Sequence, residues 1–352
     1  MKTLTKFAFA LSIGTTALTG CAADAPAPDD PSDPSDPSDP SDPLPENIDA
    51  SGKYLVKSNF DLATNLPGKV GEVTNAFIAM TDDPDDPSNW ILDQLIANTS
   101  GTFKSILQGA KPFVAGYIND RLLQIAPDFL TTFIAVGDDF GQIAKNFGLN
   151  ETLEVAASGD GWMAKHTVTG ARFKIDNVES DYPFADYGAT PIAVEGVGMS
   201  LESSGKLTLS EHTIGLQYGT VLRIGLDAAI IPSLDPSASN LTQLLQNQVD
   251  CNAVGVAVND AVIDTVGFGP GSGLFATACN LGLQKAADAV YAKIAGLNSS
   301  ALDLGLAGTA KALDKDNNGV IDTIQTGAWA GTASYAGTPA PLAGATFFGS
   351  RM

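Results

Sequence analysis

An acidic repeat near the start of the chain limits which residues can fold together. Residues 33–43 repeat aspartate, proline and serine, and residues 22–50 contain no lysine or arginine. Proline fixes the backbone and the aspartates repel one another, so this stretch cannot bury enough apolar surface to form a core. We therefore expect an extended spacer over residues 21–50 and a single folded domain over residues 51–352. A binding role for the repeat itself is the alternative.

The segment before the repeat has the features of an export signal. Two lysines precede an apolar run over residues 7–18 that is too short to cross a bilayer as a helix. The run leads into Leu-Thr-Gly-Cys at residues 18–21, which resembles the lipobox of bacterial lipoproteins. This resemblance implies that residues 1–20 are removed and that Cys21 is acylated, so that the mature chain is anchored in the bacterial envelope. Ala22, where an aspartate would favour the inner membrane, indicates the outer membrane; an ordinary secretion signal is the alternative.

The charge of the chain restricts its partners. The formal net charge is −21, because 40 acidic residues face 19 lysines and arginines. Such a surface repels phosphate backbones and anionic headgroups. We therefore exclude nucleic acid as a partner and expect contact with the membrane through the lipid anchor.

Helical periodicity occupies the first part of the expected domain. After a short strand at residues 52–62, apolar residues spaced by three or four predict helices between residues 68 and 148. One helical stripe carries four aromatic residues that could line an apolar cavity: Phe129, Phe133, Phe140 and Phe147. Plain core packing is the alternative role for this stripe.

Strand-like periodicity begins at about Asn150, where the period changes to two. The pattern predicts an antiparallel meander that continues to residue 230, with turns at residues 169–170 and 203–205. Further strands are expected near the end of the chain, at residues 302–312, 327–335 and 346–349.

Two cysteines, Cys251 and Cys279, remain after lipidation. An even pair in an oxidising compartment is expected to form a disulfide. Apolar spacing predicts two helices that carry these cysteines, one capped by Ser239 and the other over residues 275–297. Free thiols and redox chemistry are alternatives, although the spacing lacks Cys-x-x-Cys. The patterns together predict an α+β fold, in which an antiparallel curled sheet packs with apolar helices and a disulfide-clamped helical hairpin.

Residues 314–322 place oxygen-bearing side chains at alternate positions, with glycine sixth and an aliphatic residue eighth. This pattern resembles the calcium loop of EF-hand and dockerin proteins. The resemblance implies side-chain or carbonyl ligands to Ca2+ from Asp314, Asp316, Asn318, Val320 and Asp322. Gln325 replaces the glutamate of the twelfth position, and the flanks are expected to be strands, within a hairpin over residues 302–335. We therefore expect a structural calcium site of low affinity, with a metal-free turn as the alternative.

Catalytic motifs are incomplete in this sequence. His166 and His212 are the only histidines, and both fall in strand-like alternation, so we exclude a multi-histidine metal centre. Ser203 and Lys206 satisfy Ser-x-x-Lys but lie in an expected turn without the companion motifs. We therefore do not expect an enzyme; a hydrolase built on two carboxylates is a third reading.

The expected order of helices and strands over residues 51–352 resembles the tubular lipid-binding fold of bactericidal permeability-increasing proteins. In that family a curled sheet wraps a helix and leaves an apolar groove. The resemblance implies that a lipid or other apolar small molecule binds in a groove between sheet and helices. The alternative is a non-enzymatic structural or adhesive surface protein.

Overall fold

The computed structural model describes the first strand, a short segment before the second strand, and nearly all of the chain after residue 140. The described residues are 44, 48–63, 65–72, 74, 135, 136, 139, 141–159, 161–175, 177–266 and 271–352. The expected signal peptide, Cys21 and the spacer up to residue 43 lie outside them. Most of the helices expected before residue 140 also lie outside them, together with Phe129, Phe133 and Phe140.

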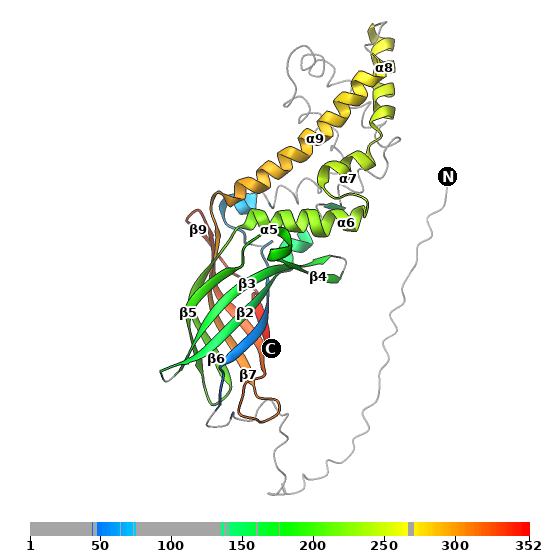
Figure 1. Ribbon diagram of the computed structural model, residues 1–352. Helices are drawn as coiled ribbons and strands as arrows, with labels where there is room; N and C mark the ends of the chain where they lie inside the picture. The colour runs from blue at the N-terminus through cyan, green and yellow to red at the C-terminus, as the bar shows by residue number, and fades with distance from the viewer. Residues whose placement is uncertain are drawn as a thin grey trace, which may run out of the picture. The chain divides into compact units, whose positions relative to one another are not determined.

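Eight antiparallel strands of the described chain form a closed barrel (Figure 1). In chain order they are β1 (Gly52–Phe60), β2 (Phe147–Ser158), β3 (Gly161–Ile175), β5 (Ile192–Leu201), β6 (Lys206–Leu216), β7 (Leu302–Leu313), β8 (Thr323–Tyr335) and β10 (Thr346–Arg351). Each strand pairs with the next in this order, and β10 also pairs with β1. Two short strands extend the sheet beside this ring, β4 (Val178–Pro183) on β3 and β9 (Thr338–Pro341) on β8.

Closure of the sheet corrects the expected curled sheet. β10 comes from the end of the chain and pairs with β1 on one side, where Tyr54 lies opposite Arg351. On the other side β10 pairs with β8, where Thr323 lies opposite Ser350. The prediction of a curled sheet is wrong because β10 pairs with both β1 and β8 and so closes the sheet into a barrel. A closed barrel has no free edge, so in this ring the sheet curls onto itself and not around a helix.

The turn expected at residues 169–170 is a β-bulge inside β3. Asn150 pairs with Gly170 whereas Glu151 pairs with Val168, so Thr169 has no partner in the ladder. The Thr169 hydroxyl instead donates to the Asn150 carbonyl oxygen at 3.0 Å. The extra residue keeps the buried side chains on both sides of the bulge on the inner face of the barrel.

The apolar run over residues 214–230 is a strand only at its start. Beyond β6 the chain forms α5 (Tyr218–Ile224), a π-helical segment η2 (Gly225–Ile230) and α6 (Ile231–Leu234). The strand expected here is wrong because the apolar residues return every three or four positions, which is a helical period. The buried residues with this period are Tyr218, Val221, Leu222, Leu226, Ala229 and Ile230.

A disulfide joins two antiparallel helices, which confirms the predicted pairing of Cys251 with Cys279. The helices are α8 (Cys251–Val266) and α9 (Ser272–Gly296), and α7 (Leu241–Gln248) precedes them. Asp250 separates α7 from α8, because its carboxylate accepts the N–H of Asn252 at 2.9 Å and so caps α8. Three helices therefore stand where two were expected.

Gly255 allows α8 and α9 to approach closely. A Cβ atom at this position would lie 2.5 Å from the Ser272 carbonyl oxygen and 2.8 Å from the Ala276 nitrogen. Near this contact, Val249, Cys251 and Leu283 form a small core that is separate from the main one. No helix in the described part of the chain is both long and apolar enough to cross a membrane.

Aromatic rings pack around Phe147, which was expected on a helical stripe. Phe147 is instead the first residue of β2, and its side chain is fully buried. Its ring centroid lies 6.4 Å from that of Phe60, 6.5 Å from that of Phe173 and 6.1 Å from that of Tyr218. Because Tyr218 belongs to α5, this cluster joins the helices to the barrel. Phe147 therefore packs as a core residue.

Candidate functional site

The acidic loop between β7 and β8 brings three carboxylates together. Asp314, Asp316 and Asp322 each offer one oxygen, and these oxygens lie within 4.8 Å of one another. Carboxylates this close repel one another unless a cation or N–H groups compensate their charge. Carboxylate oxygens are also the ligands that calcium prefers. These three residues could therefore hold a divalent cation.

The loop is folded by its own hydrogen bonds. Asp314 accepts the backbone N–H of Asn318 at 3.1 Å and that of Gly319 at 2.8 Å. Gly319 has a φ of 82°, which a glycine adopts without strain. Asn318 donates its side-chain amide to Asp316 at 3.0 Å and accepts the N–H of Val320 at 2.8 Å. The structure thus brings Asn318 next to the expected acidic ligands.

The loop also contacts both ends of the folded chain. Asp49, just before β1, forms a parallel bridge with Val320, and the N–H of Ile321 donates to the Asp49 carbonyl at 3.0 Å. At the other end, the N–H of Arg351 donates to the Asp322 carbonyl at 2.8 Å. Ile321, the aliphatic eighth residue, is fully buried. The loop therefore links the start of β1 to the end of β10, the two strands that close the barrel.

The twelfth position of the calcium pattern lies outside the loop. Gln325 is a residue of β8 and pairs with Lys311 of β7. Both flanks of the loop are strands, so the helices that hold an EF-hand loop are not its scaffold here. A site in this loop would consist of the ligands between Asp314 and Asp322.

A second polar cluster lies inside the barrel, where no site was expected. Glu151 of β2 accepts the hydroxyl of Ser58 of β1 at 2.5 Å, and the Trp329 indole N–H of β8 donates to Ser58 at 2.9 Å. His166 of β3 places Nε2 3.4 Å from Glu151 Oε2 and Nδ1 2.8 Å from Nε2 of His212 of β6. All five side chains are buried, and we call them the inner polar cluster.

The inner polar cluster left only a weak signal in the sequence. Glu151 lies between Leu149 and Leu153 on the inward face of β2, so an acid interrupts an apolar alternation. The two histidines also follow the alternation of their strands, as expected. Their contact depends on the register of β3, β5 and β6, which the sequence pattern does not specify.

The environment of His212 favours its neutral form. Burial lowers the pKa of this side chain, although a hydrogen bond with the Ser210 carbonyl oxygen opposes the shift. That hydrogen bond joins His212 Nδ1 to the oxygen at 2.8 Å.

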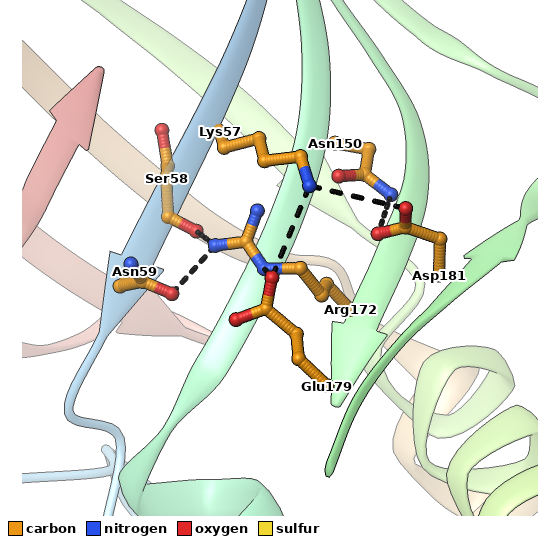
Figure 2. Close-up of polar contacts among 7 residues, drawn as sticks. All are labelled: Lys57, Ser58, Asn59, Asn150, Arg172, Glu179 and Asp181. Atoms are coloured by element: carbon orange, nitrogen blue, oxygen red, sulfur yellow. Dashed lines mark hydrogen bonds and ion pairs between the residues drawn. The ribbon is translucent and has the colours of Figure 1, made fainter. Parts of the chain in front are cut away.

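A second set of polar contacts, which we call the outer polar cluster, connects side chains of β1, β2, β3 and β4 (Figure 2). Arg172 of β3 is buried, and its guanidinium donates to Asn59 at 2.6 Å and to the Ser58 carbonyl oxygen at 3.3 Å. It also pairs with Glu179 of β4 at 3.1 Å. A Cβ atom at Gly148 would lie 2.9 Å from the Arg172 Cβ, so this glycine leaves room for the arginine. Ser58 therefore contributes to both clusters, because its hydroxyl bonds to Glu151 and Trp329 and its carbonyl oxygen accepts from Arg172.

Exposed charges complete the outer cluster. Lys57 lies 3.9 Å from carboxylate oxygens of both Glu179 and Asp181, and the Asn150 amide donates to Asp181 at 2.8 Å. Figure 2 shows that these side chains cross from β1 and β2 to β4. Positive and negative charges balance, which is typical of a structural contact between strands.

Comparisons with protein-family models, with curated proteins and with solved structures found no match to this chain. Its function is therefore inferred from its own residues. The acidic loop could hold a cation at the surface, whereas the inner polar cluster is enclosed by the barrel.

Proposed function

We propose that this chain is a non-enzymatic structural or adhesive lipoprotein of the bacterial envelope, with a barrel that calcium stabilises at residues 314–322. The observation that carries this proposal is the convergence of three carboxylates on a loop that contacts both ends of the folded chain. An acylated Cys21 and the acidic spacer would hold the barrel away from the lipid. Because the inner polar cluster is buried, it presents no side chain to a substrate.

Calcium would act on the loop through charge and position. A divalent cation removes the repulsion among Asp314, Asp316 and Asp322, and the Asn318 side chain and Val320 carbonyl would add oxygens. The loop would then hold Asp49 and Arg351 more firmly through the hydrogen bonds described above. Without a bidentate glutamate, we expect a dissociation constant on the order of 10⁻⁴ M, as in extracellular modules.

Calcium is expected to raise the melting temperature of the mature chain by about 5 °C. A concentration about 100 times the dissociation constant, here about 10 mM, stabilises the folded state by about 2.7 kcal/mol. Circular dichroism melting curves with CaCl2 or with a chelator measure this shift. Isothermal titration of CaCl2 into the protein at 25 °C measures the affinity.

Asp316→Ala provides the variant for this experiment, because Asp316 is exposed and accepts from Asn318, whereas Asp314 is buried and accepts the backbone N–H groups of both Asn318 and Gly319. We expect this variant to lose both the heat of calcium binding and the rise in melting temperature that calcium causes. Asp186→Ala removes an exposed acid of η1 (Phe184–Tyr187), far along the chain from the loop, and should respond like the wild type. A wild type without heat or shift would contradict the calcium site, as would an unchanged response of Asp316→Ala.

A second candidate function, binding of a lipid or other apolar ligand, is favoured by α8 and α9. Val256 and Ile263 on α8, and Leu274 and Leu281 on α9, are between 41% and 54% exposed. Each pair is seven residues apart, so its members share one face of their helix. Residues 251–259 and 272–284 contain no charged residue. The hairpin would therefore offer an apolar surface in place of the groove expected from the sequence.

Zwitterionic phosphatidylcholine vesicles test this second function, because they do not repel an acidic protein. The mature chain with Cys21→Ser, which carries no acyl group, is expected to float with the vesicles in a density gradient. The double variant Leu274→Gln and Leu281→Gln should bind about 100-fold more weakly, since each buried leucine contributes about 1.5 kcal/mol or more. Leu55→Gln alters a similarly exposed leucine of β1 and serves as the control. Equal binding by all three chains would contradict a role for the hairpin.

A further inference from the structure

Hydrogen-bond directions inside the barrel fix where the protons of the inner polar cluster lie. The Ser210 carbonyl oxygen only accepts, so His212 Nδ1, at 2.8 Å from it, must carry a proton. If His212 is neutral, its Nε2 is then an acceptor. His166 Nδ1, at 2.8 Å from this atom, must therefore donate.

The remaining nitrogen of His166 faces a carboxylate. His166 Nε2 lies 3.4 Å from Glu151 Oε2, and two atoms without a proton between them would repel each other. The proton belongs on His166, because Glu151 Oε2 already accepts the Ser58 hydroxyl at 2.5 Å, a distance typical of a hydroxyl bound to an ionised carboxylate. The Trp329 ring supports the same assignment. It stacks on the His166 ring at 5.7 Å with an interplanar angle of 14°, where a cation gains from the aromatic face.

We propose that the inner polar cluster is a buried ion pair of the Glu151 carboxylate and the His166 imidazolium, linked to a neutral His212, and that it makes the barrel sensitive to acid. The hydrogen bonds then run in a consistent direction, from Trp329 through Ser58 to Glu151, and from His166 through His212 to Ser210. His166 Nε2 makes no hydrogen bond and faces Glu151 Oε2 as an ion pair at 3.4 Å. A further proton on His212 Nε2 would place two N–H donors 2.8 Å apart. The cluster therefore accommodates one extra proton and no second one.

The residues around His212 offer little negative charge to compensate a second proton on its ring. The strands beside β6 contribute apolar side chains, with Leu306 of β7 opposite His212 and Met199 of β5 opposite Leu209. In the described part of the chain, Glu151 and His166 are the charged groups that influence His212. The neighbouring Glu211 is exposed, and the guanidinium of Arg172 lies on the outer face of the barrel.

Proton counting gives the expected pH dependence. In the folded barrel the two imidazole rings together carry one proton more than two neutral rings would. In the unfolded chain they carry about two extra protons below pH 6.5 and none above it. Stability rises with pH where the unfolded chain binds more protons and falls where it binds fewer. These histidines should therefore give a stability maximum near pH 6.5. On each side of it, the unfolding equilibrium constant should increase by up to about tenfold per pH unit.

Nitrogen-15 NMR of the histidine rings tests the proton positions directly. The chain has only 2 histidines, so a mature chain made without a histidine tag gives few signals to assign. At pH 7 we expect His166 to carry protons on both nitrogens and His212 to carry one on Nδ1 alone. A neutral His166, or a His212 with its proton on Nε2, would overturn the proposal.

His212→Gln separates the acid response from folding. A glutamine side chain can accept from His166 and donate to Ser210, but it cannot take up a proton. Urea denaturation between pH 5 and pH 8 measures the free energy of unfolding of this variant. We expect the loss of stability below pH 6.5 that is due to His212 to disappear, and the loss of stability above pH 6.5 to remain. If the free energy of unfolding of the variant fell as steeply below pH 6.5 as that of the wild type, the proposal would be overturned. If the variant does not fold, the NMR assignment of the wild type decides by itself.

Discussion

Replacement of Glu151 by alanine is expected to lower the free energy of unfolding by about 3 to 5 kcal/mol. The variant leaves the His166 imidazolium buried without its counter-ion, and the Ser58 hydroxyl loses the oxygen to which it donates. Urea denaturation at pH 6.5 measures this loss. A change below about 1 kcal/mol would contradict a buried ion pair.

Two further variants separate the ion pair from a general effect of losing an acid. Glu154→Ala, on the same strand, removes an exposed carboxylate that pairs with Lys53 at 2.8 Å, and it should change stability far less. The double variant Glu151→Ala and His166→Ala should be much more stable than the sum of the single losses predicts, because neither charge is then left unpaired. Additive losses would show that Glu151 and His166 do not act as a pair.

Local patterns predicted several strands of the fold but not the closure of the barrel. The alternation around β1, β5, β6, β7 and β8 identified these strands, because one face of each is buried and the other is not. Alternation alone does not state which strand pairs with which. The pairing of β10 with both β1 and β8 joins residues from opposite ends of the chain, and no local signal marks it. For the same reason a curled sheet was expected in place of a closed barrel.

Irregular positions explain the other differences. Thr169 and Gly170 have the composition of a turn, yet β3 accommodates the extra residue as a bulge. Phe147 continues a helical spacing in the sequence, yet β2 begins at this residue. The apolar run after Leu216 is rich in strand-forming residues, but its buried positions follow a helical period. At Thr169 and Phe147 tertiary contacts outweigh the local preference, whereas the run after Leu216 carries the helical period in its own sequence.

The two sites differ in how far the sequence can predict them. The proposed calcium ligands of the acidic loop lie within nine consecutive residues, so their spacing alone suggests a shared centre. The inner polar cluster draws one side chain from each of five strands, and its members meet only through the register of the barrel. A glutamate within the apolar face of β2 is the kind of residue that could have indicated it, because buried acids are rarely without a partner.

Removal of the disulfide by Cys251→Ser and Cys279→Ser is expected to cost about 3.5 kcal/mol in the chain-entropy model, because the bond closes a loop with a sequence separation of 28. We expect the loss to be confined to α8 and the first half of α9. Cys251 of α8 and Leu283 of α9 form a small core with Val249, which follows α7, whereas Ala287 and Ile294 of α9 belong to the main core. Hydrogen exchange followed by mass spectrometry resolves the two regions.

Amides of α8 are expected to exchange about 100 to 1000 times faster in the double serine variant, since 1.36 kcal/mol corresponds to a factor of ten. Amides of β2, β3 and β7 should keep their protection, because their contacts do not depend on the hairpin. Wild-type protein treated with a reductant provides the matched control and should behave like the variant. Equal loss of protection in helices and barrel would show instead that the disulfide stabilises one cooperative unit. The apolar surface of the hairpin would then depend on the same folding transition as the ion pair.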